Sequence, residues 1–232
     1  MKTVSLTRKI LSIILKLIVI VSATTGILIS SLASRNTFMG GGKLFMFFTI
    51  QSNIAIALIC LAGLVLLLSG KPIGSVWHVI KFVGTISITL TGAVFAFVLA
   101  PTMGGRAWSL PNTLTHLVVP VAAVIDFFVI ACTAGIRKRN VFFVIIPPIL
   151  YAIYAGIGYV KNWEFATGVN YPYFFLNWGS PAGAFGFTDG LPFMGCAWWI
   201  LVLLLFLIGI GYLYLVIADL IGRKINSQEV AK

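Results

Sequence analysis

The chain has 232 residues, of which 60% are hydrophobic and only 9% are charged, and its formal net charge is +11. Soluble domains carry roughly 25% charged residues, so this composition excludes an ordinary soluble protein and indicates a membrane protein. Excess positive charge also occurs in nucleic-acid-binding proteins, but no basic run here is interleaved with exposed aromatic residues, so we expect no nucleic-acid partner.

The hydrophobic residues are gathered into long runs. A helix that crosses a membrane needs about 20 predominantly apolar residues. The connections between the runs are short and rich in Gly, Pro, Ser and charge, except for a long aromatic segment at 161–193. The sequence therefore predicts an all-α polytopic membrane protein, a single six-helix transmembrane domain over 1–232. The six predicted spans are 10–33, 44–68, 76–99, 113–134, 141–160 and 194–221.

The distribution of Lys and Arg predicts the orientation, because cytoplasmic segments of membrane proteins carry an excess of both. With a cytoplasmic N-terminus, the inner segments hold twelve of these residues and the outer segments hold four, namely Arg35, Lys43, Arg106 and Lys161. We therefore expect both termini to be cytoplasmic, 161–193 to be external, and the protein to lie in the plasma membrane.

An alternative interpretation of the first run is a signal peptide. Basic residues precede it, and Ser31-Leu32-Ala33 resembles a cleavage site. The length of the apolar run and the charge count favour a retained transmembrane helix.

The second span opens with the polar residues of "FFTIQSN". Thr49, Ser52 and Asn53 fall at i, i+3 and i+4, which places them on one face of a helix. Polar side chains in hydrocarbon are costly unless they find partners. Hydrogen bonds between neighbouring helices are the simplest role for Ser52 and Asn53. A functional site is the alternative.

The fourth span carries a matching polar face, with Asn112, His116 and Pro120 one helical turn apart. From the predicted ends of the spans, Thr49 lies about 8 Å deep and His116 about 5 Å deep, on the same side of the membrane. A lone buried histidine is more often a packing residue than a catalytic one. A hydroxyl and an imidazole at one depth, however, form the minimal activated nucleophile.

Other candidate residues are weaker. Asp126 is a buried acid of unknown role, about 15 Å from His116 along the helix axis. Glu164 and Asp189 belong to the external segment and are candidates to fold back over the site. The cysteines Cys60, Cys132 and Cys196 are odd in number and all lie in apolar segments, so we expect no disulfide framework. No CxxC or HExxH spacing occurs, so we expect no metal site.

The stretches "FFTIQSN" and "NTLTHLVVPVAAVIDF" resemble bacterial six-span relatives of the androgen-induced gene product and ADTRP family. The resemblance covers the whole span layout, although its motifs are short. Characterised eukaryotic members are intramembrane threonine hydrolases that cleave fatty acid esters of hydroxy fatty acids, and they depend on one Thr and one His. The resemblance implies that Thr49 and His116 are the corresponding residues here.

The hypothesis from the sequence is an intramembrane hydrolase of a lipid-like ester that needs no cofactor. Thr49 is the expected nucleophile, His116 the general base, and the amides of Asn53 or Asn112 the candidates that stabilise the oxyanion. A small-solute transporter or channel is the alternative, with Asn53 and Asp126 lining a path. A noncatalytic membrane scaffold is the third possibility. The sequence assigns no oligomeric state.

Overall fold

The structure is a computed structural model that describes residues 5–33, 41–70, 74–130 and 136–230. These residues form an all-helical multi-pass membrane protein with no named strand among them. Six helices are long and apolar enough to cross a membrane: Leu6–Ala33, Phe48–Ser69, Ser75–Met103, Leu110–Ile130, Lys138–Val160 and Cys196–Lys224.

Several of these six spans are built from more than one element. In chain order the elements are α1 (Leu6–Ala33), η2 (Gly41–Met46), α2 (Phe48–Ser69), α3 (Ser75–Val94), η3 (Phe95–Leu99), α4 (Ala100–Met103), η4 (Gly104–Arg106), α5 (Leu110–Thr113), η5 (Leu114–Val118), α6 (Val119–Ile130), η6 (Lys138–Ile145), α7 (Ile146–Val160), η7 (Phe174–Leu176) and α8 (Cys196–Val230).

The predicted spans agree with these helices except at their ends. The second span was expected to begin at residue 44, but 41–46 form the separate 3₁₀ helix η2, so Thr49 lies in the first turn of α2. The predicted end of the fourth span at 131–134, which includes Cys132, lies outside the described residues.

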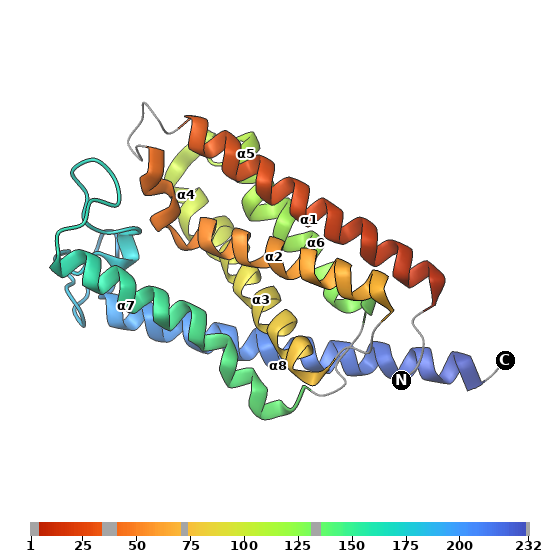
Figure 1. Ribbon diagram of the computed structural model, residues 1–232. Coiled ribbons are helices and arrows are strands. Elements are labelled where there is room, and N and C mark those ends of the chain that lie inside the picture. The colour runs from red at the N-terminus through yellow and green to blue at the C-terminus, as the bar shows by residue number, and fades with distance from the viewer. Residues whose placement is uncertain (1–4, 34–40, 71–73, 131–135, 231–232) are drawn as a thin grey trace.

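The helices form two groups joined by α3 (Figure 1). In the first group α1 packs against α2 and α6, and α3 packs against both α2 and α6. In the second group α7 and α8 lie along each other, and α3 contacts α8 and η6. The start of α1 and the end of α8 lie at one end of the bundle, which we name the terminal end.

Apolar side chains fill the space within each group. Leu15 and Val19 of α1 meet Ile56 of α2, Ile88 of α3 and Val119 of α6 in one buried cluster. A second cluster joins α3, α6, η6 and α8 around Phe82, Ile86, Phe127, Val141 and Leu207. Because α3 contributes to both clusters, it holds the two groups together.

Two π-helical turns interrupt the helices of the first group. The turn η3 precedes Pro101, and the turn η5 precedes Pro120. A proline has no N–H to donate and its ring clashes with the preceding turn, so the helix must adjust locally. Single π-helical turns of this kind are frequent at functional sites.

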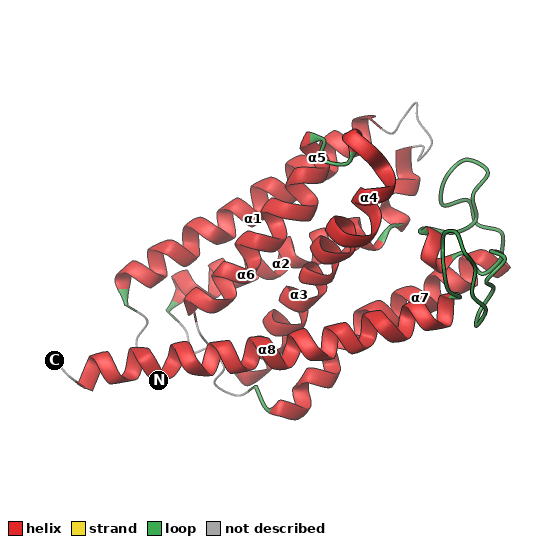
Figure 2. Cartoon of the chain, turned by 180° about the vertical axis from the view of Figure 1, so that it is seen from behind, coloured by secondary structure: helices red, strands yellow, loops and turns green. Residues whose placement is uncertain are grey.

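The segment 161–193 covers the end of the bundle opposite the terminal end, which we name the loop end (Figure 2). It contains an isolated β-bridge between Ala166 and Val169 and the short helix η7, and Phe187 forms a second bridge with Met194 just beyond the segment. Glu164 pairs with Lys43 of η2 at 2.5 Å, and Tyr151 of α7 donates a hydrogen bond to the Met46 carbonyl at 3.1 Å. These contacts fix both the segment and η2 at the loop end.

Candidate functional site

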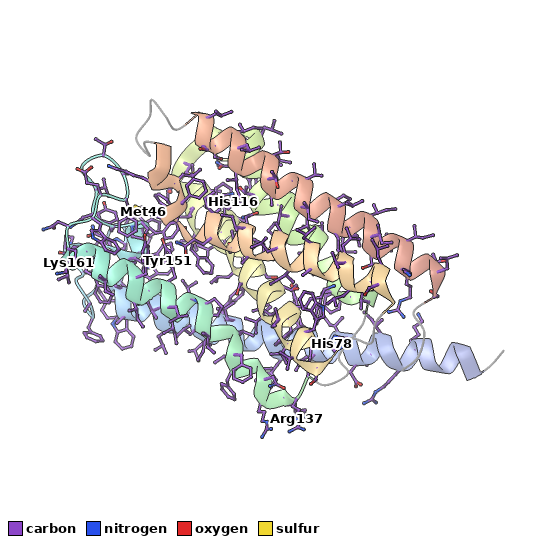
Figure 3. All side chains as sticks on the ribbon, viewed as in Figure 1. Met46, His78, His116, Arg137, Tyr151 and Lys161 are labelled. Carbon is purple, nitrogen blue, oxygen red and sulfur yellow. The ribbon has the colours of Figure 1, made fainter. Side chains whose placement is uncertain are left out.

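The structure brings Thr49 and His116 together, although 67 positions separate them in the sequence. Thr49 lies in α2 and His116 lies in η5, and His116 Nε2 is 3.3 Å from Thr49 Oγ1. His116 lies toward the loop end, whereas His78 lies near the other end of the bundle (Figure 3). A hydroxyl and an imidazole therefore meet near the loop end.

The contacts of His116 Nδ1 show which of the two ring nitrogens carries the proton. His116 Nδ1 is 3.0 Å from the Asn112 carbonyl oxygen and 3.1 Å from Thr115 Oγ1. The Thr115 hydroxyl donates its hydrogen to the Pro111 carbonyl at 2.9 Å. Since a carbonyl oxygen only accepts, Nδ1 is the nitrogen that donates. The lone pair of the neutral imidazole is then on Nε2, facing Thr49.

The ring of His116 is held in place by an aromatic neighbour. Phe95 stacks on it with ring centroids 3.8 Å apart and planes inclined by 22°. Phe95 and His116 lie in the two π-helical turns, η3 and η5. Gly92 allows these segments to approach, because a Cβ atom there would lie 3.0 Å from the His116 carbonyl oxygen. The imidazole therefore has one packed face and two bonded nitrogens.

Tyr173 reaches the same hydroxyl from the segment at the loop end. Its Oη accepts a hydrogen bond from the Thr49 N–H at 3.3 Å and lies 3.4 Å from Thr49 Oγ1. The first N–H groups of a helix have no partner within the helix, so a side chain that accepts from one satisfies it. Burial raises the pKa of Tyr173 above its ordinary value, which keeps its hydroxyl protonated. Tyr173 is therefore a hydrogen-bond donor beside Thr49.

The sequence points to Thr49 as a candidate, but it offers Tyr173 only as one of several aromatic residues in the long segment at 161–193. No spacing rule connects Tyr173 to Thr49, which is 124 positions away. The one signal in the sequence is that the tyrosine lies in the long segment predicted to be external, on the side of the membrane that Thr49 is expected to face.

Ser52 and Asn53 lie one turn further along α2, where both donate to the Thr49 carbonyl oxygen, at 3.0 Å and 2.8 Å. Ser52 also bonds to Thr91 of α3, and the Asn53 amide also donates to the Thr115 carbonyl at 3.2 Å. Both residues therefore connect α2 to a neighbouring segment beside Thr49.

The amide of Asn112 also points away from Thr49. Its nitrogen donates to the Ala107 carbonyl at 2.8 Å, and the Asn53 amide hydrogens are engaged with the two carbonyls named above. The amides expected to stabilise the oxyanion are thus engaged elsewhere, whereas the Tyr173 hydroxyl lies 3.4 Å from Thr49 Oγ1.

Thr49, His116 and Tyr173 line a cavity of about 440 Å³, which we name the loop-end cavity. Most of its other walls are apolar, contributed by residues such as Phe95 and Leu99. Residues on its rim, including Thr102 and Met103, are exposed. A largely apolar cavity of this size with a few convergent polar groups is typical of small-molecule sites, which span roughly 300–1,000 Å³.

Asp126 takes part in a separate cluster near the terminal end. Its carboxylate contacts Lys16 at 2.7 Å and Lys81 at 2.5 Å, and it accepts a hydrogen bond from Ser12. We name Ser12, Lys16, Lys81 and Asp126 the charge cluster. The four residues come from α1, α3 and α6, and none of them is more than 9% exposed.

The charge cluster corrects the charge count made from the sequence. The charge count from the sequence includes Lys16 and Lys81 among the twelve cations of the inner segments. Their ammonium groups, however, lie inside the bundle with Asp126. Ser12 and Lys16 lie at i and i+4 on α1, a spacing that places both polar side chains on one face of the helix.

The remaining candidates lie elsewhere. Glu164 is paired with Lys43, whose hydrogen bond lowers the pKa of the Glu164 carboxyl group. Asp189 is exposed. Neither carboxylate is among the contacts of Thr49 or His116. Cys60 and Cys196 are free thiols in buried positions. Within the described part of the chain, no group of three or more His, Cys, Asp or Glu side chains is placed to hold a metal ion.

The chain matches no protein-family model, no curated protein and no solved structure. Its function is therefore inferred from the contacts of Thr49, His116 and Tyr173.

Proposed function

We propose that this protein is an intramembrane hydrolase of a lipid-like ester, with Thr49 as the nucleophile and His116 as the general base. The observation that carries the proposal is the contact between His116 Nε2 and Thr49 Oγ1 at 3.3 Å. A distance slightly beyond ideal is common in unliganded sites, where catalytic hydrogen bonds tighten only with substrate. The resemblance to intramembrane threonine hydrolases supports the same two residues.

In the first half-reaction, Thr49 Oγ1 attacks the ester carbonyl carbon while its proton passes to His116 Nε2. The carbonyl oxygen becomes an oxyanion that accepts a hydrogen bond from the Tyr173 hydroxyl. The positive end of the α2 dipole, which lies at Thr49, favours this negative charge. The bond to the leaving alcohol then breaks, and His116 returns the proton to the alcohol oxygen.

In the second half-reaction, water replaces the alcohol. His116 Nε2 takes a proton from the water, whose oxygen attacks the acyl-Thr49 carbonyl carbon. The bond between the acyl carbon and Thr49 Oγ1 breaks, and the proton returns to Oγ1. The free acid leaves, and the resting hydroxyl is restored.

The setting of the proposed enzyme is the plasma membrane, with both termini cytoplasmic. Lys16 and Lys81 both pair with Asp126 inside the bundle, so we leave them out of the count of surface charges. The remaining count is ten Lys and Arg on the proposed inner side against four on the outer side, which still favours this orientation. Lipid-like substrates would then enter the loop-end cavity from the outer leaflet.

The test of the proposal is covalent labelling with a fluorophosphonate probe, which reacts with activated hydroxyl nucleophiles. We expect the purified protein in detergent to be labelled, and folded Thr49→Ala protein to remain unlabelled. A transporter or a scaffold has no activated hydroxyl, so equal labelling of both proteins, or labelling of neither, would contradict the proposal.

Tyr173→Phe removes the proposed oxyanion donor and keeps the aromatic ring. We expect kcat for ester hydrolysis to fall by about 10²–10³-fold, the usual cost of losing one such donor. Steady-state kinetics on one long-chain ester measure the change. Tyr212→Phe is the matched control, because this exposed tyrosine of α8 neither lines the loop-end cavity nor contacts Thr49. A Tyr173→Phe enzyme with unchanged kcat would remove Tyr173 from the mechanism.

The orientation is tested by the accessibility of introduced cysteines in intact cells. Asp189→Cys places an exposed thiol at the loop end, and Ser69→Cys places one at the other end of α2. We expect an impermeant thiol reagent added outside to label Asp189→Cys and not Ser69→Cys, with the unmodified protein as background. The reverse pattern would overturn the orientation.

A small-solute transporter is the second candidate, and the charge cluster is the observation in its favour. Ionisable residues inside a membrane often mark substrate or ion pathways. Transport predicts that Asp126→Asn abolishes solute flux in liposomes and that Thr49→Ala retains it. The hydrolase proposal predicts that no solute flux depends on either residue.

A further inference from the structure

Thr49 lies between two cavities of very different size. The loop-end cavity occupies about 440 Å³ on one side, and a second pocket of about 70 Å³ lies on the other. Thr49, Leu99 and Tyr173 line both. We name the second one the small pocket. Its other walls are mostly apolar side chains of α2, α3, α7 and α8 together with Phe175 and Leu176, and they also include Thr91 and Tyr151. Every residue that lines it is buried or half-buried.

The position of His116 distinguishes the two cavities. His116 lines the loop-end cavity and is not among the residues of the small pocket. The group that takes the proton from Thr49 must later give it to the leaving alcohol oxygen, so that oxygen has to lie on the His116 side. An ester bound across Thr49 therefore places its alcohol arm in the loop-end cavity and its acyl arm in the small pocket.

The volumes set the length of each arm. A cavity of about 150 Å³ holds benzene, which is roughly 25 Å³ per carbon atom. By this ratio the small pocket holds about three carbons beyond the carbonyl and the loop-end cavity about 18. Because the rim of the loop-end cavity is exposed at Thr102 and Met103, a longer arm extends through it.

We propose that the site is selective for esters of a short acyl group, from acetyl to butyryl, with a long apolar alcohol. This inference rests on the proposed hydrolase function and specifies its substrate class. The reaction is ester plus water giving a short carboxylic acid and the long-chain alcohol. The short acyl group stays on Thr49 Oγ1 in the intermediate, while the alcohol leaves through the loop-end cavity. Water then enters the space that the alcohol has left and releases the acid.

The first part of the test uses two isomeric esters and the full-length purified protein in detergent. Hexadecyl acetate and ethyl hexadecanoate have the same atoms, but the short arm is the acyl group only in the first. One methylene too many in an apolar pocket costs about 10–200-fold in kcat/KM, so we expect hexadecyl acetate to be favoured by at least ~10-fold. Equal rates, or faster hydrolysis of ethyl hexadecanoate, would overturn the inference.

The second part enlarges the small pocket. Leu203→Ala removes three carbons from its wall, whereas Leu205→Ala is a matched control on the exposed face of α8. We expect unmodified protein to prefer hexadecyl butyrate over hexadecyl hexanoate by at least ~10-fold. Leu203→Ala should reduce this preference to within about 3-fold, and Leu205→Ala should keep it. A preference that Leu203→Ala leaves unchanged would overturn the inference.

The two proposals fail in different ways. Thr49-dependent hydrolysis without the predicted chain-length preference would contradict the substrate class and leave the hydrolase function standing. Absence of Thr49-dependent hydrolysis on every ester of the panel would contradict the hydrolase function itself, and the substrate class with it.

Discussion

Thr49→Ala is expected to lower kcat/KM for ester hydrolysis by about 10³-fold or more, because it removes the oxygen that attacks the ester. His116→Ala removes the base and should cost about 10²–10⁴-fold. Both residues are half-buried in a packed site, so each variant is first checked for an unchanged thermal transition in detergent. Initial rates on a panel of long-chain esters then measure the effect.

The double variant separates a shared mechanism from two independent effects. Because a nucleophile and its base act as one unit, Thr49→Ala with His116→Ala should be little slower than the slower single variant. Thr49→Ser keeps a hydroxyl and should retain part of the activity. Thr25→Ala, on the exposed face of α1, is the control and should behave like the unmodified protein. A folded Thr49→Ala protein with full activity would exclude Thr49 as the nucleophile.

Asp126→Ala is expected to give the largest loss of stability among single substitutions in the charge cluster. The change leaves the ammonium groups of Lys16 and Lys81 buried without their counterion, and breaking a buried ion pair in this way costs about 3–5 kcal/mol. Thermal unfolding in a mild detergent should show a clear decrease in the transition temperature.

A compensated variant gives the matched control for Asp126→Ala. Replacing Lys16 and Lys81 by Met and Asp126 by Leu removes all three charges together, and exchanging buried charges for apolar groups of similar volume is often neutral or stabilising. We therefore expect the triple variant to be more stable than Asp126→Ala. Asp219→Asn breaks only an exposed pair with Arg223 and should leave the transition unchanged. If the Asp126→Ala protein unfolds at the same temperature as the unmodified protein, Asp126 is not the counterion that stabilises the buried lysines.

The spans were predictable from the sequence because helix length in a membrane depends on apolar run length, which composition records directly. Their ends were less predictable. The boundary at residue 44 was early because Leu44, Phe45 and Met46 continue the apolar run, while their backbone belongs to a separate 3₁₀ helix. Hydrophobicity alone does not distinguish one helix type from another.

The candidate site was predictable in part. Thr49 and His116 were found because each stands in an apolar run near the same predicted membrane face, so depth alone brought them together. Tyr173 was missed because the path of a 33-residue aromatic segment does not follow from any periodicity. The charge cluster was missed because Lys16 and Lys81 near the proposed inner face are equally consistent with ordinary surface cations.

The charge cluster has a consequence for how the chain is made. Lys16 is synthesised 110 residues before Asp126, and Lys81 45 residues before it. At about 5–20 residues per second, the partner of Lys16 is translated roughly 5–20 s later. A lysine at the centre of a transmembrane helix costs about 2.5–3.5 kcal/mol during insertion. The first helix therefore has to be held in the bilayer by its other, apolar side chains until the fourth span brings Asp126 beside Lys16.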